Sequence, residues 1–373
     1  MAEKFSLKDH LFNSETVGRL AAEFAAGVPG FDAARFKAEA LGGFADRELM
    51  ERLDWMADCL EPQLAPDFPE MADHLEAALP ERLDPALKDD DFGHFIHAVH
   101  GILTVRHGLE AHRDRALDLL HAATQRFSME YYIRPFLNRW TDETLARLAL
   151  WAEDENYHVR RLVSEGTRPK LPWAKAVDLR PDQTLPLLDK LHGDDARFVT
   201  RSIANHLNDI TKGEPDLVMD RLEMWAGEGR QSAKELDWMT RHALRTRVKA
   251  GHPRAMKMLG FDPDATFVCD VALGEEPVQI GGALAFSVTL KADQKTPVLV
   301  DYVLKLRNAK GGQGEKVFKL KQAVVQPGTP LVLDKVHKLK AAATTFRLFP
   351  GEQGLVVQVN GRAVAETVFE LLE

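Results

Sequence analysis

The chain contains only two cysteines, Cys59 and Cys269, and they lie far apart in the sequence. This number excludes a disulfide framework and the structural zinc sites built on paired cysteines, and it favours a reducing compartment. The sequence also has no apolar stretch long enough to span a bilayer, and its first residues, MAEKFSLKDHLFN, lack the apolar run of a signal peptide. We therefore expect a cytoplasmic protein with no membrane partner.

The chain has no excess of basic residues. Its formal net charge is −9, which by itself argues against a nucleic-acid partner, because proteins that neutralise phosphates are usually basic. Residues 1–126 carry 13 Lys and Arg against 24 Asp and Glu, residues 127–264 carry 22 against 22, and residues 265–373 carry 13 against 11. The acidity is confined to the first third, so binding of a polyanion depends on the local arrangement of basic residues.

The length of the chain and a change in its pattern predict two domains. Apolar residues recur at helical spacing up to about residue 262, in short segments separated by Pro, Gly and Asp-rich turns. Further on they alternate, and Asn360-Gly361 between two alternating runs predicts a hairpin. We expect a helical domain over 1–262 and an antiparallel immunoglobulin-like β-sandwich over 266–373, with the boundary near 260–264.

The helical region repeats with a period of about 40 residues. Shifted by this period, Asp142-Glu-Thr-Leu145 aligns with Asp182-Gln-Thr-Leu185, Arg161 aligns with Arg201, and Arg201 aligns with Arg241. Each repeat has the pattern helix, turn, helix, which is typical of HEAT repeats at this length. The pattern predicts an α-solenoid of HEAT-like repeats, in which the second helix of each pair lines a concave surface.

These second helices carry polar residues at spacings of three or four, which place them on one helix face. Stacked in register, the faces would form one stripe rich in arginine, which suits duplex DNA or RNA. For any single pair the alternative is a solvated face with a weak ion pair. The residues are Arg161 and Glu165, then Arg201, Asn205 and Asp209, then Arg241, Arg245 and Lys249.

Carboxylates within such a stripe repel phosphates, so Glu130 and Glu165 need another explanation. One explanation is that they stabilise a positive charge, to which nearby aromatic faces can contribute. A carboxylate beside an aromatic face would stabilise an oxocarbenium ion during cleavage of a glycosidic bond. Core packing is the alternative for most of the aromatics, but Trp173 follows Leu171-Pro172 in a break between helices, where a helix core accommodates a large ring less readily.

Several segments resemble AlkC-type DNA alkylation repair proteins, which belong to a superfamily of HEAT-like repeat DNA glycosylases. The resemblance covers about residues 5–262, and members of this family with an added immunoglobulin-like domain agree with the pattern of 266–373. Tyr131-Tyr132 departs from the family, where Phe-Ala is more usual. The similar segments are Ser128-Met-Glu-Tyr-Tyr-Ile-Arg-Pro-Phe-Leu137, His158-Val-Arg-Arg-Leu-Val-Ser-Glu-Gly-Thr-Arg-Pro-Lys-Leu-Pro-Trp173, Val199-Thr-Arg-Ser-Ile-Ala-Asn-His-Leu-Asn-Asp-Ile210 and Arg241-His-Ala-Leu-Arg245.

The resemblance implies a monofunctional DNA glycosylase that hydrolyses the N-glycosidic bond of cationic alkylated bases, such as 3-methyladenine and 3-methylcytosine, in duplex DNA. It implies no cofactor and no full flipping of the base. Glu130, Glu165 and Trp173 match the catalytic positions of the family. We expect Glu165 to place a water, Glu130 to share the electrostatic role, and Trp173 to stack on the deoxyribose. We also expect a monomer in the bacterial cytoplasm, associated with the nucleoid when bound.

The matching segments and one basic hairpin supply the expected contacts with DNA. The loop Gly311–Lys316 lies within a basic run that either touches the DNA backbone or is a solvated hairpin. The expected DNA-binding residues are Arg134, Arg160, Arg161, Arg168, Arg201, Asn205, Asn208, Asp209, Arg241, His242, Arg245, Lys310 and Lys316.

Two other interpretations are weaker. A non-catalytic HEAT scaffold that binds protein or nucleic-acid partners would explain the repeats, but it has no need for Glu165 and Trp173 beside an arginine stripe. His94, His97 and His100 share a helix face and could be mistaken for a metal site. A metal would need a further ligand and a closed geometry, so we expect ordinary packing and no metal.

Overall fold

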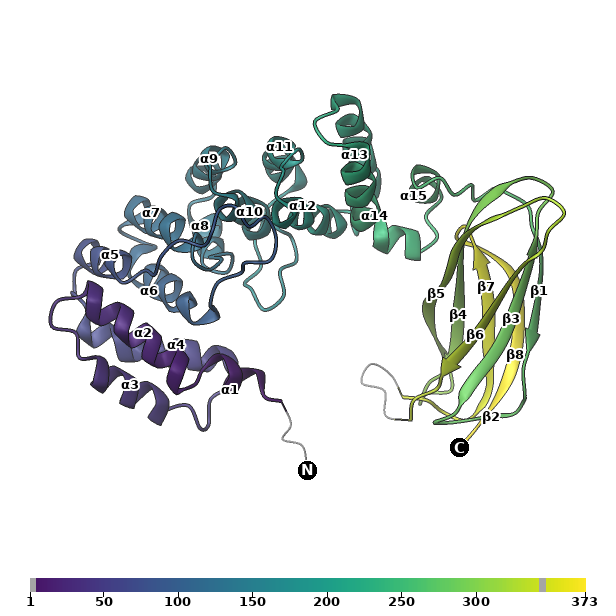
Figure 1. The fold of residues 1–373 in the computed structure, drawn as a ribbon, viewed down its shortest axis with the longest axis horizontal. Helices are drawn as coiled ribbons and strands as arrows, with labels where there is room; N and C mark the ends of the chain where they lie inside the picture. The colour runs from purple at the N-terminus through teal and green to yellow at the C-terminus, as the bar shows by residue number, and fades with distance from the viewer. Residues whose placement is uncertain (1–4, 342–346) are drawn as a thin grey trace. The chain divides into compact units, whose positions relative to one another are not determined.

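The computed structural model describes residues 5–341 and 347–373. Contacts divide the chain into two compact units, Met1–Ala243 and Leu244–Glu373. The first unit is built from helices and the second mainly from strands (Figure 1). Within the part of the chain that is described, no helix combines the length and the apolar character needed to cross a membrane.

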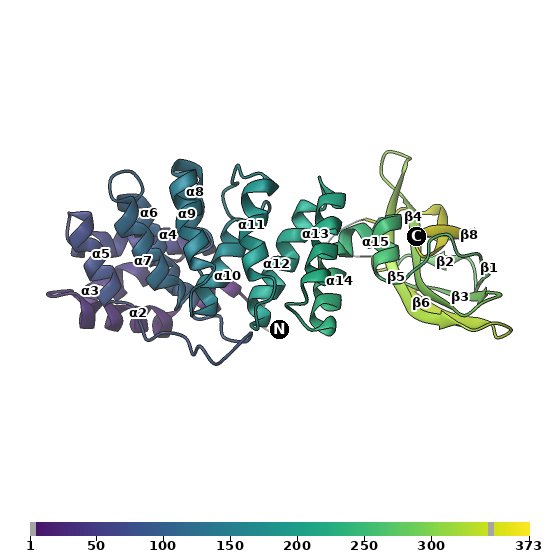
Figure 2. The same cartoon turned by 90° about the horizontal axis from the view of Figure 1, so that it is seen from above.

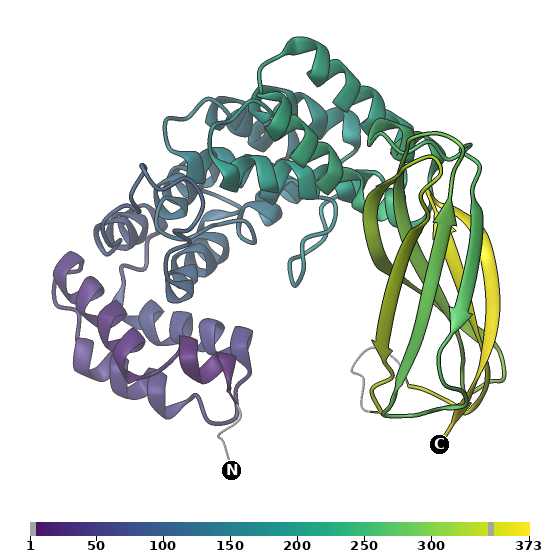
Figure 3. The same cartoon turned by 45° about the vertical axis from the view of Figure 1, so that its right-hand side comes forward.

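The helices of the first unit stack along a curved row (Figures 1 and 3), and α9, α11 and α13 follow one another along it (Figure 2). The helices of the described residues, of which α15 and the end of α14 belong to the second unit, are α1 (Leu7–Leu11), α2 (Ser14–Gly27), α3 (Ala33–Gly42), α4 (Leu49–Leu60), η1 (Glu61–Gln63), α5 (Phe68–Ala77), η2 (Phe95–His97), α6 (Ala98–Gly108), α7 (Arg113–Thr124), α8 (Ile133–Arg139), α9 (Thr141–Trp151), α10 (Tyr157–Gly166), α11 (Pro181–Leu191), α12 (Arg197–Ile210), α13 (Pro215–Glu228), α14 (Ala233–Lys249) and α15 (Pro253–Met258).

The starts of α9 to α12 confirm the predicted period of about 40 residues. Helices α9 and α11 begin at Thr141 and Pro181, and α10 and α12 begin at Tyr157 and Arg197. The first turn of α10 is capped by Asn156, whose side chain accepts a hydrogen bond from the backbone of the helix. The residue before α12 is an alanine, which cannot cap through its side chain.

Helices α10 and α12 pack directly against each other on the inner side of the row (Figure 1). Their apolar faces bury Val159, Val163 and Ile203 completely. Gly166 ends α10, and a Cβ atom there would lie 2.5 Å from the side chain of Ile133 in α8. Glycine at this position therefore lets α8 approach the end of α10, which brings the segment before α8 close to the polar face of α10.

The second unit contains a two-sheet β-sandwich (Figure 3), which confirms the predicted immunoglobulin-like architecture. One sheet has the order β1-β3-β6 and the other β2-β8-β7-β4-β5. The predicted hairpin at Asn360-Gly361 joins β7 to β8, with both residues at positive φ. The strands are β1 (Val268–Leu273), β2 (Val278–Gln279), β3 (Ala283–Lys291), β4 (Thr296–Arg307), β5 (Gln313–Val325), β6 (Leu331–Lys338), β7 (Gly351–Val359) and β8 (Arg362–Leu372).

The end of α14 and the whole of α15 belong to the second unit, whereas the sequence predicts a helical domain that extends to residue 262. Met256 and Phe261 are buried against Leu299 of β4. The side chain of Asn360 donates a hydrogen bond of 2.8 Å to the backbone oxygen of Asp262. These contacts attach α15 to the sandwich. The periodic pattern of the sequence marks a change of secondary structure, but it does not show which core a helix joins.

Candidate functional site

Glu165 lies in the last turn of α10, where it faces α12, and only 4% of its surface is exposed. Both carboxylate oxygens accept hydrogen bonds. Oε1 accepts one from Arg168, and Oε2 accepts one of 2.6 Å from the hydroxyl of Ser202 in α12. Arg161, one turn earlier in α10, lies with Nη2 3.5 Å from Oε2. The carboxylate is thus buried but fully compensated by two cations and a hydroxyl.

Glu165 is the centre of a chain of alternating charges, which we call the buried ion network. Its members are Glu130, Arg161, Glu165, Arg168 and Asp209. Arg161 also pairs with Glu130, in the turn before α8, and Arg168 lies with Nη2 3.0 Å from Oδ2 of Asp209 in α12. The predicted faces of two neighbouring repeats therefore meet, together with the segment around Glu130.

The surroundings of the network keep Glu165 ionised. Burial alone would raise the pKa of Glu165, but the charges of Arg161 and Arg168 and the hydrogen bond from Ser202 outweigh it and lower the pKa. Burial likewise opposes the charge on Arg161, yet its two carboxylate neighbours raise its pKa. The carboxylate of Glu165 is therefore an electrostatic group at neutral pH and not a proton donor.

Buried ion pairs add little stability compared with apolar packing of the same volume, because removing the charges from water costs free energy. The carboxylate of Glu130 differs from that of Glu165, because among the described residues only one of its two oxygens is bonded. Its Oε2 is held by Arg161 and Ser128, and its Oε1 has no hydrogen-bond partner among the described residues. The network thus presents one carboxylate oxygen that can still accept a hydrogen bond from a ligand or a water, which favours a role in binding or catalysis.

Trp173 lies in the connection between α10 and α11, and 78% of its surface is exposed. Its φ angle is 63°, in the left-handed region that a bulky side chain rarely adopts. The connection is fastened on both sides, because Leu171 is buried and the backbone oxygen of Lys175 accepts a hydrogen bond from Arg134. A strained and exposed indole on a fixed connection is an arrangement found at ligand sites.

Arg134 is buried, although the sequence analysis predicts that it contacts phosphates. Only 1% of its surface is exposed, and its guanidinium donates to the backbone oxygens of Gly166, Arg168 and Lys175. Those three carbonyls lie at the end of α10 and in the connection after it, so Arg134 ties the connection that carries Trp173 to α8. The correction has a physical reason, because a guanidinium committed to three buried carbonyls has no surface left for an anion.

Five more predicted DNA contacts also have internal roles, and two of them, Arg161 and Arg168, belong to the buried ion network. The side chain of Asn208 is buried and donates a hydrogen bond to the backbone oxygen of Ala243. Asp209 is buried in the ion network and pairs with Arg168 and Lys212. Arg160 pairs with Asp194 of the next repeat. Packing between repeats, which the sequence does not reveal, takes up these polar groups.

The remaining predicted contacts stay accessible to different degrees. Arg201 is partly exposed and pairs with Asp89. Arg241 pairs with Asp237 one turn earlier in α14. His242 Nε2 lies 2.8 Å from Oδ1 of Asn205, which joins α14 to α12. Arg245 is exposed farther along α14.

Lys310 and Lys316 lie in the second unit, in and beside the turn between β4 and β5. Both are exposed. The backbone N–H of Lys310 donates to the side chain of Asn308, so the turn is closed internally and its lysines face solvent. The predicted hairpin is present, and a DNA contact there remains a prediction.

Three residues that matter to the site escape the sequence analysis. Ser202 and Ser128 donate hydrogen bonds to Glu165 and Glu130, and Asp89 pairs with Arg201. Ser202 follows Arg201 in a segment that resembles the family, so the resemblance is the one signal for it in the sequence. Asp89 lies outside the repeat, and no pattern in the sequence relates it to α12.

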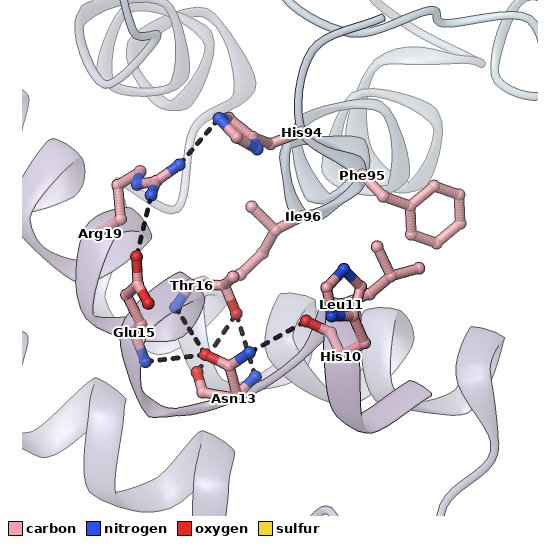
Figure 4. Close-up of a pocket in the computed structure, with 9 residues that line it drawn as sticks. All are labelled: His10, Leu11, Asn13, Glu15, Thr16, Arg19, His94, Phe95 and Ile96. Carbon is pink, nitrogen blue, oxygen red and sulfur yellow. Dashed lines mark hydrogen bonds and ion pairs between the residues drawn. The ribbon is translucent and has the colours of Figure 1, made fainter. Parts of the chain in front are cut away.

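A separate cavity of about 350 Å³ lies between α2 and η2 (Figure 4). Its polar groups bond mainly to one another. Arg19 contacts His94 and Glu15, and Asn13 caps α2. The cavity shares no residue with the buried ion network, and His94 takes part in an ordinary side-chain contact there.

Comparisons with known proteins agree with this architecture. The family model for the C-terminal Ig-like domain of the uncharacterised protein YhaZ matches residues 268–373. The uncharacterized protein YhaZ of Bacillus subtilis (strain 168) is 32% identical over 265 residues, which make up 70% of this chain and 73% of that protein.

A solved structure, that of Pseudomonas fluorescens alkylpurine DNA glycosylase AlkC bound to DNA containing an abasic site analog, is similar along nearly the whole chain. The TM-score is 0.87 and the sequence identity 30%, and the likeness covers 99% of this chain and 100% of that one. The chain therefore belongs to the AlkC family, and it carries the C-terminal immunoglobulin-like domain that is also found in YhaZ.

Proposed function

We propose that this protein is a monofunctional DNA glycosylase that removes cationic alkylated bases, such as 3-methyladenine and 3-methylcytosine, from duplex DNA and so initiates base excision repair. The observation that carries the proposal is the likeness to the alkylpurine DNA glycosylase AlkC over the whole chain. The buried ion network supports the reaction class, because it holds an ionised carboxylate in the last turn of α10, just before the connection that carries the exposed Trp173.

Cleavage of the N-glycosidic bond of a cationic base requires few catalytic groups on the protein. A base that already carries a positive charge leaves readily, so no strong general acid is required. The barrier falls when negative charge stabilises the oxocarbenium-like sugar that forms as the bond breaks. Glu165 suits this electrostatic role because Arg161 and Arg168 lower its pKa and keep it ionised.

Glu130 is better suited than Glu165 to place the attacking water. Both oxygens of Glu165 are occupied by Arg168 and Ser202, whereas Glu130 Oε1 has no partner among the described residues. We therefore assign the water to Glu130, in place of the expected assignment to Glu165. Glu165 keeps the electrostatic role. Trp173 would stack on the deoxyribose from its fixed connection, where the exposed ring needs no rearrangement to reach a ligand.

Arg201, Asn205, Arg241, His242 and Arg245 would hold the DNA backbone. Lys310 and Lys316 would add contacts from the second unit. The mechanism uses no lysine as a Schiff-base nucleophile, so the strand stays intact after the base has left.

The test is the release of free bases from duplex DNA that carries 3-methyladenine or 3-methylcytosine. We expect the full-length protein to release the methylated base and leave an abasic strand that breaks only on treatment with alkali. A protein that binds the duplex without releasing either base contradicts the proposal, as does strand cleavage without alkali.

A further inference from the structure

The connection between α5 and η2 crosses the first turns of α10 and α12 (Figure 1). We call residues 79–94 the acidic strap, because it contains Asp84 and the run Asp89-Asp90-Asp91 within the acidic first third of the chain. The strap belongs to the same compact unit as α10 and α12. It therefore brings carboxylates next to the helices that carry the predicted DNA contacts.

Asp89 of the strap forms an ion pair with Arg201 of α12, in which only Oδ2 has hydrogen-bond geometry. Oδ1 lies 2.5 Å from Nη2 of Arg201, and Oδ2 accepts a hydrogen bond of 3.2 Å from Nη1. The side chains are 28% and 36% exposed, respectively. A carboxylate paired with a guanidinium occupies a place that a phosphate oxygen could also take. In the free protein Asp89 thus occupies the position that a DNA phosphate would take on Arg201.

The backbone of the strap does not depend on this ion pair. The oxygen of Lys88 accepts a hydrogen bond of 3.1 Å from the N–H of Phe198, and so supplies the cap that Ala196 cannot give to α12. The ring of Phe92 packs 5.3 Å from the ring of Phe198. Because these contacts fix the strap on either side of Asp89, the carboxylate can leave Arg201 while the strap stays in place.

We propose that the acidic strap is an autoinhibitory contact, in which Asp89 occupies Arg201 until a DNA phosphate displaces it. The inference rests on the proposed function, because it requires Arg201 to bind DNA. Displacement returns the carboxylate of Asp89 to solvent at the rim of the site. The exchange of one anion for another lowers the affinity for any duplex, damaged or not, and shortens the time spent on undamaged DNA.

The residue next to Asp89 in the strap provides a control substitution. Asp90 is adjacent, exposed, and without an ion-pair partner among the described residues. D89N and D90N remove the same charge from nearly the same place, so both relieve long-range repulsion of DNA equally. Only D89N releases Arg201.

The experiment measures the dissociation constant of the full-length protein for an undamaged duplex oligonucleotide at about 0.1 M salt. We expect D89N to tighten binding by about threefold to tenfold, and D90N by less than about twofold. In an R201A background the two substitutions should have equal effects, because Arg201 is then absent. Unchanged unfolding temperatures for D89N and D90N would show that the strap is still folded.

Two outcomes overturn the proposal and separate it from the function on which it rests. If wild-type protein binds duplex DNA but D89N and D90N have equal effects, the strap inference alone is wrong. If neither wild-type protein nor any variant binds duplex DNA, the proposed function is wrong as well.

Discussion

The hydroxyl of Ser202 donates a hydrogen bond of 2.6 Å to Oε2 of Glu165, across the interface between α10 and α12. This bond stabilises the ionised form of the carboxylate, and it is one reason why the pKa of Glu165 is lowered despite burial. It also links the chemistry of the proposed site to the stacking of two repeats.

The S202A variant tests this link through the pH dependence of base release. Loss of the hydrogen bond raises the pKa of Glu165, so the ionised form is lost at a higher pH as the solution is acidified. We expect the acid limb of the pH–rate profile to move upward. S164A is the matched control, because Ser164 is bonded to Ser202 and not to Glu165. Identical profiles for S202A and S164A would contradict the assignment.

Arg201 is expected to contact a phosphate, so its removal should change how strongly DNA binding depends on salt concentration. Each phosphate contact releases a counterion, so R201A should weaken binding to all duplex sequences and lower the slope of log K against log salt by about one. The slope is measured by titrating duplex DNA at several salt concentrations. A slope equal to that of wild-type protein would remove Arg201 from the DNA interface.

Arg134 is expected to stabilise the fold and not to bind DNA directly. R134A leaves three backbone oxygens without their buried donor and should lower the free energy of unfolding by about 3 kcal/mol. R180A removes an exposed arginine that pairs with Asp182, and should cost less than about 1 kcal/mol. Urea unfolding followed by circular dichroism compares the two, and equal midpoints would contradict the buried role.

Substitution of Trp173 should reduce base release while leaving the stability of the fold nearly unchanged. W173G removes a bulky side chain from a left-handed conformation but adds freedom to the unfolded chain, so the free energy of unfolding should change by less than about 1 kcal/mol. Base release should fall strongly, because the exposed ring is lost. W173F should retain part of the activity. A W173G protein that releases base at the wild-type rate would show that the indole does not act on the substrate.

Buried histidines predict how stability depends on pH. Burial lowers the pKa of His206 to about 4 and that of His158 to about 4, so both are neutral in the folded protein. The unfolded chain binds protons below about pH 6.5, so stability is full above that pH and falls as the pH decreases towards 4. Each histidine should contribute a slope of up to about 1.4 kcal/mol per pH unit. H206Q should flatten the dependence by that amount in urea unfolding, and an unchanged slope would contradict this origin.

The sequence predicts the repeat well because its period is a local property. The starts of α9 and α11 and of α10 and α12 follow from aligned turns, and Glu165 and Arg161 share a helix face by spacing alone. The hairpin at Asn360-Gly361 follows from local backbone preferences in the same way. Each of these features is decided within a few residues.

Features that depend on distant partners were not predictable in this way. In the sequence, Arg134 resembles a surface cation. Its burial depends on backbone oxygens at and after the end of α10, which no sequence pattern places beside α8. The spacing of Asp209 and the resemblance around Asn208 both suit a groove, yet both residues are buried by partners in neighbouring repeats. The pairing of Asp89 with Arg201 depends on the path of a long connection, which no period describes.

The most direct test of the account is the rate at which E165Q releases 3-methyladenine from methylated duplex DNA, compared with E155Q. Glu155 is an exposed residue in the turn before α10, so E155Q removes an equal charge near the site without touching the ion network. We expect E155Q to keep nearly the wild-type rate and E165Q to lose at least about 100-fold, because an ionised carboxylate no longer stabilises the sugar cation. Equal rates for the two variants, with both proteins folded, would contradict the central role of Glu165.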